Sequence, residues 1–229
     1  KPRPPELLTW DLLLNSEETL GKAAMEADQI AMMIGGMYMK TRKLAEIGDP
    51  GNMTPDEVKL VGDWMIERKK AGQFRNFWKN YDEQLANFVN GEVLVQRCWE
   101  PIVKDCKKQG IDVEYAYCSD FHVNWMHAAF VTAPAAASDR TDEIYTALDW
   151  FIGGAYAASH AARTGYTCSR MDLGLEYATA EGWSEDQIAA VKTNQEKVEF
   201  KLSNPNFWIP GAPDEMKAYT EQAERLRNA

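Results

Sequence analysis

The chain has 229 residues, of which 45 % are hydrophobic and 26 % are charged, an ordinary composition for a globular protein with one large domain or two small lobes. Its net charge of −10 disfavours binding to nucleic acid and to anionic lipid headgroups. No run of about eighteen apolar residues predicts a transmembrane helix. The Pro-rich start at residues 1–5 is typical of a cut or processed end, so no targeting signal indicates a compartment.

The N-terminal part of the chain is predicted to hold one short strand among helices. Apolar residues at 4–14 follow a helical stripe, and residues 21–26 (GKAAME) are typical of a short strand. Asp28 is placed to cap a Met-rich helix over 29–47. The segment 54–72 opens with Thr, Pro and Glu at positions that suit a capped helix.

Strand and helix patterns alternate in the next segments. Residues 74–78 predict a short strand, and residues 82–89 predict a helix. An apolar β run over 92–99 (EVLVQRCW) precedes a helix over 101–109, and residues 111–117 alternate in the manner of a strand. This alternation predicts the α/β class, with a sheet covered by helices.

The pattern changes beyond residue 134. Residues 122–132 are apolar and aromatic and predict a last strand, after which the periodicity is helical. Helices are expected over residues 138–164, 172–181, 184–202 and 214–228. The glycine pairs at 35–36 and 153–154 lie inside helical patterns, where they would allow close packing.

The sequence lacks the motifs of common enzyme classes, including dinucleotide-binding, phosphate-binding, serine-hydrolase and zinc-protease motifs. His122 and His127 are expected on opposite faces of one strand, which does not favour a shared metal site. The four cysteines show no zinc-binding spacing. They are expected as reduced thiols or, in an oxidising compartment, with one disulfide among Cys98, Cys106 and Cys118.

Residues 80–109 combine a short helix, an Asn-Gly-Glu turn, an apolar strand that ends in Trp99, and a further helix. This order resembles the solute-binding proteins of ABC importers, and in particular their spermidine- and putrescine-binding branch. In that branch a Gly-Glu-Val segment leads through an apolar strand to a Trp that faces the ligand. Residues 91–93 carry the same three amino acids here.

Further short matches follow in the same order along nearly the whole chain. They are residues 10–22 for the start of the family's second lobe, 124–126 for its pocket strand, 138–163 for a long helix, 164–166 for the Gly-Tyr after it, and 206–208 for a Trp before the last helix. Their order and spacing, rather than any one of them, carry the resemblance.

The resemblance implies a periplasmic-binding-protein-like architecture: two α/β lobes joined by a hinge, with a ligand in the cleft between them. Residues 1–16 would be an interlobe segment and 17–121 the second lobe. Residues 122–229 would be a return strand and C-terminal helices of the first lobe, which is incomplete in this chain. In the family, ligand binding closes the lobes, and the closed form docks on the membrane permease.

The sequence departs from the polyamine binders at two acidic positions. His127 stands where the family has an acidic residue two positions after the pocket Trp, and a second family carboxylate falls near Ala31. Aromatic walls with one or two carboxylates suit a cationic or zwitterionic amine. The change at His127 favours a smaller or less charged ligand than a long diamine.

The resemblance implies Trp99, Trp125 and Tyr166 as walls of the ligand pocket, with Glu100 and His127 as polar contacts. Core packing is the alternative for each Trp. The implied protein is a periplasmic or extracytoplasmic solute-binding protein that serves an ABC transporter permease, uses no cofactor or metal, and is not an enzyme. Two alternatives stay open: a non-transport interaction domain, and an enzyme with a metal or thiol centre that uses His127 with Glu100 or a cysteine.

Overall fold

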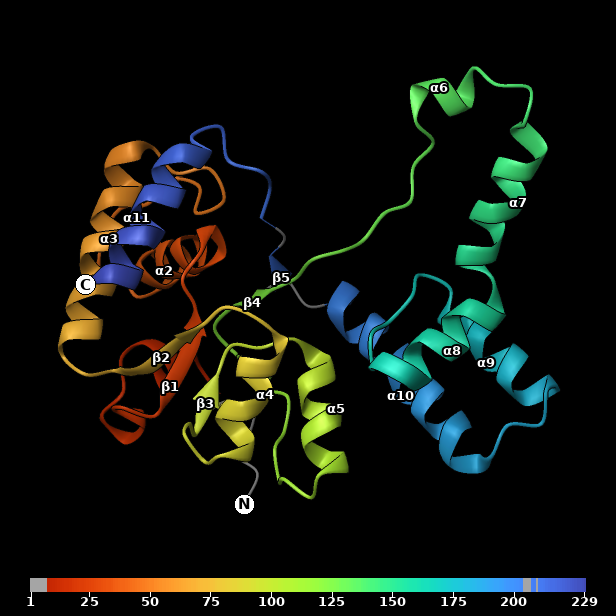
Figure 1. Cartoon of the computed structure of the whole chain (residues 1–229), viewed down its shortest axis with the longest axis horizontal. Helices are drawn as coiled ribbons and strands as arrows, with labels where there is room; N and C mark the ends of the chain where they lie inside the picture. Colours follow the sequence, from red (N-terminus) through yellow and green to blue (C-terminus); the bar gives the residue numbers. More distant parts are fainter. Residues whose placement is uncertain (1–7, 204–206, 209) are drawn as a thin grey trace. The chain divides into compact units, whose positions relative to one another are not determined.

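The computed structural model describes residues 8–203, 207–208 and 210–229. The chain divides into two compact units, one formed by Lys1–Trp125 with Asn206–Ala229 and the other by Met126–Pro205. Figure 1 shows a small sheet with helices around it in the first unit and a group of helices in the second. The predicted α/β class is therefore confirmed, and the sheet is parallel, whereas the two-lobed architecture stays a prediction.

A three-stranded parallel sheet forms the centre of the first unit. Its strands β1 (Ala23–Glu26), β2 (Phe74–Trp78) and β3 (Val95–Gln96) lie in the order β2-β1-β3. β1 is paired along both edges, and its first three residues are fully buried. A strand buried on both faces is a continuous apolar run, which is why the pattern at residues 21–26 predicted it.

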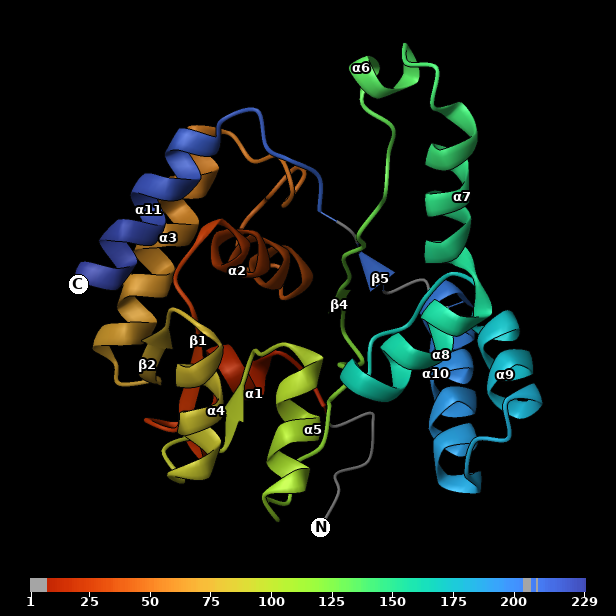
Figure 2. The ribbon, with the colours of Figure 1, turned by 45° about the vertical axis from the view of Figure 1, so that its right-hand side comes forward.

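Helices cover both faces of this sheet (Figure 2). Alternate residues of a strand point to opposite faces, so Ala23 and Met25 pack into the main core while Ala24 packs into a smaller one. The helices are α2 (Gln29–Thr41), α3 (Pro55–Lys70) and α11 (Met216–Asn228) around the main core, α4 (Tyr81–Val89) beside the smaller core, and α5 (Glu100–Lys108) packed on α4.

Capping residues begin α2 and α3 where the sequence predicted them. The Asp28 carboxylate accepts hydrogen bonds from the backbone amides of Ile30 and Ala31, at 2.8 and 3.2 Å, and so caps α2. Thr54 and Glu57 form a complete capping box at the start of α3. These local contacts fix the chain direction as it leaves β1 and as it turns into the second helix.

The second unit is built from helices. They are α6 (Ala133–Ala136), α7 (Thr141–Ile152), α8 (Gly154–Thr164), α9 (Met171–Ala180) and α10 (Glu185–Ser203). The single helix predicted over 138–164 is wrong, because Gly153 has an extended backbone (φ −78°, ψ 161°) that separates α7 from α8. Small and apolar side chains of α8, α9 and α10, such as Ala157, Met171 and Val191, form the core of this unit.

Two glycines let pairs of helices approach closely. A Cβ atom on Gly35 of α2 would lie 2.7 Å from Cγ1 of Val61 in α3, and one on Gly154 would lie 2.3 Å from the backbone oxygen of Leu173 in α9. Both distances are shorter than a normal carbon contact, so any larger residue would push the helices apart. The predicted packing role of these glycines is confirmed.

Several predicted strands are shorter than expected or missing from the described residues. The run 92–99 pairs only at β3, and residues 111–117 form no strand. Within 122–132 only β4 (His122–Val123) pairs, in parallel with β5 (Phe207–Trp208). An alternating pattern becomes a strand only beside a strand edge, and the tyrosines of 111–117 instead pack their rings against β4.

The N-terminal helix is also shorter than predicted. Of residues 4–14, only α1 (Asp11–Leu14) is helical among the described residues, residues 1–7 lie outside them, and a 3-10 turn, η2 (Glu17–Thr19), follows. α2 ends at Thr41 rather than at residue 47. None of the helices in the described part of the chain has the length and apolar character of a membrane span.

The C-terminal helix α11 belongs to the first unit, where Tyr219 and Leu226 are fully buried in the main core. The hydroxyl of Tyr219 accepts a hydrogen bond of 2.7 Å from the backbone amide of Met53, which ties α11 to the turn before α3. Residues 126–205 form the second unit, whereas α11 lies beside α3 in the first unit (Figure 1). The predicted lobe boundaries stay a prediction.

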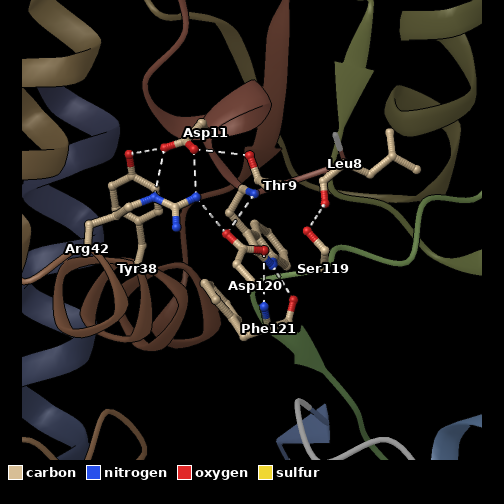
Figure 3. A network of polar contacts seen from close by, with 9 residues as sticks. Leu8, Thr9, Asp11, Tyr38, Arg42, Ser119, Asp120 and Phe121 are labelled. Carbon is tan, nitrogen blue, oxygen red and sulfur yellow. Dashed lines mark hydrogen bonds and ion pairs between the residues drawn. The ribbon is translucent and has the colours of Figure 1, made fainter. Parts of the chain in front are cut away.

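An ionic network joins the segments by which the chain enters and leaves the sheet (Figure 3). The Nη2 atom of Arg42, just after α2, lies 2.6 Å from a carboxylate oxygen of Asp11 and 2.9 Å from one of Asp120. The backbone amide of Ser119 donates a hydrogen bond of 2.8 Å to the Leu8 carbonyl. We call Arg42, Asp11 and Asp120 the Arg42 clasp.

Removing the centre of the Arg42 clasp should destabilise the first unit. Arg42→Ala is expected to lower the free energy of unfolding by about 2 kcal/mol, because the Asp120 side chain is only 6 % exposed and would lose its ionic partner. Arg42→Lys should recover part of this loss, since Lys keeps the charge but not the planar fork. Urea unfolding of the three proteins measures both effects, and a loss under about 0.5 kcal/mol for Arg42→Ala would show that the clasp is not stabilising.

Acid should weaken the same clasp. Burial alone would raise the pKa of the Asp11 carboxyl, but hydrogen bonds from Arg42, Tyr38 and Thr9 outweigh it and hold this pKa below the usual value of 3.8. The stabilisation from Asp11 is therefore fully present above pH 3.8 and is lost as the pH falls through the lowered pKa. The difference between the wild type and Arg42→Ala should shrink correspondingly in strong acid.

Candidate ligand site at the carboxyl ends of β1 and β3

The strand order of the sheet creates one edge that suits ligand binding. The connection from β1 to β2 runs through α2 and α3, and the chain then returns through α4 to place β3 on the other side of β1. In open α/β sheets, ligands bind beyond the carboxyl ends of the strands at the point where the order reverses. That point lies here between β1 and β3, which end in Glu26 and Gln96.

An ion pair occupies this switch point. Nη1 of Arg97, the residue after β3, pairs with Oε1 of Glu26, the last residue of β1. The Glu26 side chain is 4 % exposed and that of Arg97 is 18 % exposed. Oε2 of Glu26 is buried and has no hydrogen-bond partner among the described residues. A buried charge is costly unless it is paired and its hydrogen bonds are satisfied, so this carboxylate is only partly compensated by the chain.

The surroundings of Glu26 favour its protonated form. Burial raises the pKa of Glu26 to about 7; Arg97 opposes this change, and the nearby Asp28 carboxylate adds to it. Desolvation therefore outweighs the ion pair. A carboxyl group with a pKa near neutrality, at a switch point of a sheet, is the kind of group found at binding and catalytic sites.

Trp99 follows Arg97 by two residues and is part of an aromatic cluster. It is 37 % exposed, and its ring lies 5.7 Å from that of Trp78 in an edge contact and 6.2 Å from that of Tyr81 in a stacked one. Its backbone amide donates a hydrogen bond of 3.0 Å to the buried Gln84 side chain of α4. Gln84 thereby holds the backbone at the start of α5, and the Trp99 side chain stays partly exposed.

Glu100 follows as the first residue of α5 and lies near a second aromatic group. Burial is the main cause that raises the pKa of Tyr115 and of Tyr117, and the nearby Glu100 carboxylate raises both further. The ring of Tyr117 lies 5.2 Å from that of His122, which lies 4.7 Å from that of Phe207. These rings join the segment before β4 to β4 and β5.

The other three predicted site residues fall elsewhere in the chain. Trp125 is the last residue of the first segment of the first unit and is 43 % exposed, while His127 and Tyr166 belong to the second unit. Both of the latter residues lie near His160. Burial lowers the pKa of His160, and the nearby Arg163 and His127 lower it further. The ring of Tyr166 lies 6.1 Å from that of His160. A single pocket formed by all five predicted residues stays a prediction.

The Glu26–Arg97 pair was not predicted from the sequence. The assignment of Trp99 as a site residue stays a prediction. Glu26 ends a predicted strand and Arg97 lies two residues before Trp99, but no spacing in the sequence relates these two charges. The one available signal was an acidic residue at the end of a fully apolar strand, since charged residues are almost never fully buried without a partner. That signal predicts a cationic partner without naming it.

Metal and thiolate chemistry have little support at this edge. Among the described residues, no group of three or more His, Cys, Asp or Glu side chains could hold a metal ion. All four cysteines are free thiols, so no disulfide joins Cys98, Cys106 or Cys118. Burial raises the pKa of Cys98 and of Cys118 to about 12, so both thiols are protonated and poor nucleophiles at neutral pH.

Comparisons with known proteins do not assign the chain to a family. No protein-family model matches it, and no curated protein does either. The resemblance to solute-binding proteins therefore stays a prediction that depends on the order of the short motifs.

Proposed function

We propose that this protein binds a small solute, a cationic or zwitterionic amine, beyond the carboxyl ends of β1 and β3 and delivers it to an ABC importer outside the cytoplasm. The observation that carries the proposal is the position of Trp99. Its indole is partly exposed and follows, by two residues, the Arg97 that forms a buried ion pair at the switch point of a parallel sheet. An aromatic face attracts a cation by about 0.5–2 kcal/mol, and a carboxylate beside it adds a counter-charge.

The path of the chain supports a hinged, two-lobed arrangement of the full binding protein. Residues 8–11 of the predicted interlobe segment and residues 119–121 at the end of the predicted second lobe lie side by side in the first unit (Figure 3). Trp10 stacks on Phe121 with ring centroids 5.0 Å apart, and its indole donates a hydrogen bond of 2.8 Å to the Phe121 carbonyl. Two crossing segments that run together in this way are typical of a hinge between lobes.

Trp99→Ala tests the proposed site. We expect it to weaken binding of an amine ligand at least tenfold, since it removes the aromatic face. The cost in stability should be about 1–2 kcal/mol, below the 3–5 kcal/mol of a core Trp, because a third of the side chain is already exposed. A thermal-shift screen of cationic and zwitterionic amines followed by calorimetry measures the binding, and urea unfolding measures the stability.

Trp64→Ala is the matched control. Trp64 is a partly buried Trp on α3 that stacks on Tyr38, so its loss should have a similar effect on stability but leave binding unchanged. If no amine binds the wild type, the proposed function is wrong. If Trp99→Ala binds as tightly as the wild type, the site lies elsewhere.

A further inference from the structure

We infer that Arg97 binds a carboxylate of the solute, with Glu26 holding the guanidinium in place behind it, so that the solute is of the α-amino acid type. The inference rests on the proposed function and narrows it to a ligand with a carboxylate and an ammonium on the same carbon. Glu26 is a positioning residue for Arg97, and Arg97 is the residue that touches the ligand.

The difference in exposure between the two charges supports this assignment. Arg97 retains 18 % of its side-chain exposure, whereas Glu26 retains 4 %. A solute that arrives from solvent therefore meets the guanidinium before the carboxylate. A simple diamine would meet a like charge there, and like charges in close contact are unfavourable.

The Arg97 guanidinium has N–H donors that no described residue uses. Its Nη1 atom pairs with Glu26, and no other hydrogen bond or ion pair of its side chain occurs among the residues that the structure describes. A guanidinium carries five N–H donors in a planar fork that matches a carboxylate with two parallel hydrogen bonds. The pairing with Glu26 fixes the direction of that fork, which lowers the entropy lost when a ligand carboxylate binds.

The requirement for an ammonium close to the carboxylate follows from the direct contact within the pair. Because Arg97 and Glu26 touch, the opposite charges that they attract in a ligand must also be near neighbours. Oε2 of Glu26 is buried without a hydrogen-bond partner among the described residues, and Asp28 adds a second negative charge nearby. The negative charge of these two carboxylates would attract an ammonium that lies next to the ligand carboxylate bound by Arg97.

The aromatic cluster would then receive the rest of the solute. Trp99, two residues after Arg97, and Tyr81 present stacked rings with 6.2 Å between their centroids. Such faces accept an apolar or a cationic side chain. The ion pair therefore selects the amino-acid group, and the rings set the preference for its side chain.

Amino acids and the amines that lack only their carboxylate provide a matched test. The pairs are ornithine with putrescine, leucine with 3-methylbutylamine, and phenylalanine with phenethylamine, each measured by calorimetry on the full chain. We expect at least one amino acid to bind tenfold or more tightly than its amine, the effect of one charge-assisted, two-point contact. The double variant Glu26→Gln/Arg97→Gln, which leaves no buried unpaired charge, should abolish this preference.

Arg97→Lys is the second variant, in case the double variant does not fold. It keeps a positive charge beside Glu26 without the planar fork, so the preference for the amino acid should fall several-fold. Amines that bind as tightly as the amino acids would overturn the inference and leave the proposed function standing. A preference that survives in the variants would show that another group binds the carboxylate. If no compound in the panel binds, the proposed function itself fails.

Discussion

Arg97→Ala is expected to lower the free energy of unfolding by about 2–3 kcal/mol at pH 8, through the lost ion pair and the lost packing of its side chain. The mutation leaves Glu26, whose side chain is 4 % exposed, without its only cationic partner among the described residues. Without a counter-ion this buried group takes up a proton that the unfolded chain does not hold at pH 8, and the chain cannot move the group to the surface without breaking the pairing of the central strand β1. Urea or guanidinium unfolding followed by circular dichroism measures the loss.

The double variant Arg97→Ala/Glu26→Gln separates the charge from the packing. Gln has nearly the shape of Glu and no charge, so most of the lost stability should return when it replaces Glu26. Arg75→Ala is a matched control, because Arg75 pairs with Glu92 on the surface, where the two side chains are 51 % and 36 % exposed. That variant should lose under about 1 kcal/mol. A double variant as unstable as Arg97→Ala would show that Arg97 acts by packing instead.

Between pH 4.5 and pH 7 the wild type should lose up to about 3 kcal/mol of stability through Glu26, in proportion to the change in its pKa. As the pH rises, the unfolded chain releases this proton near its usual pKa of 4.5, whereas the folded chain retains it until about 7. The folded state therefore binds more protons across this window, and stability falls with rising pH. Arg97 opposes the change and Asp28 adds to it, but burial dominates both.

Glu26→Gln should remove this fall and exceed the wild type in stability above pH 7. The free energies of unfolding of both proteins, measured at intervals between pH 4.5 and pH 8, give the difference curve. His160 acts in the opposite direction, because its pKa is lowered below 6.5 in the folded chain, but it contributes equally to both proteins and cancels. A difference that does not change with pH would show that Glu26 stays ionised throughout.

The sequence by itself determined the features that depend on near neighbours in the chain. Asp28 and Thr54 begin their helices because a cap needs only the next three backbone amides. The strand at 23–26 was predictable from its apolar run, and Gly35 from its place in a helical pattern. Trp99 was predicted at the end of an apolar strand; the strand β3 ends earlier, at Gln96, and Trp99 precedes the first residue of α5.

Only the tertiary structure decided which distant residues meet. The order β2-β1-β3 places the end of β3 beside that of β1 and so pairs Arg97 with Glu26, a contact that no local pattern encodes. The same holds for residues 111–117, whose alternation is that of a strand but which have no strand edge to join. Secondary structure follows largely from the local chain, whereas strand pairing, burial and the pKa of a carboxyl group depend on which segments pack together.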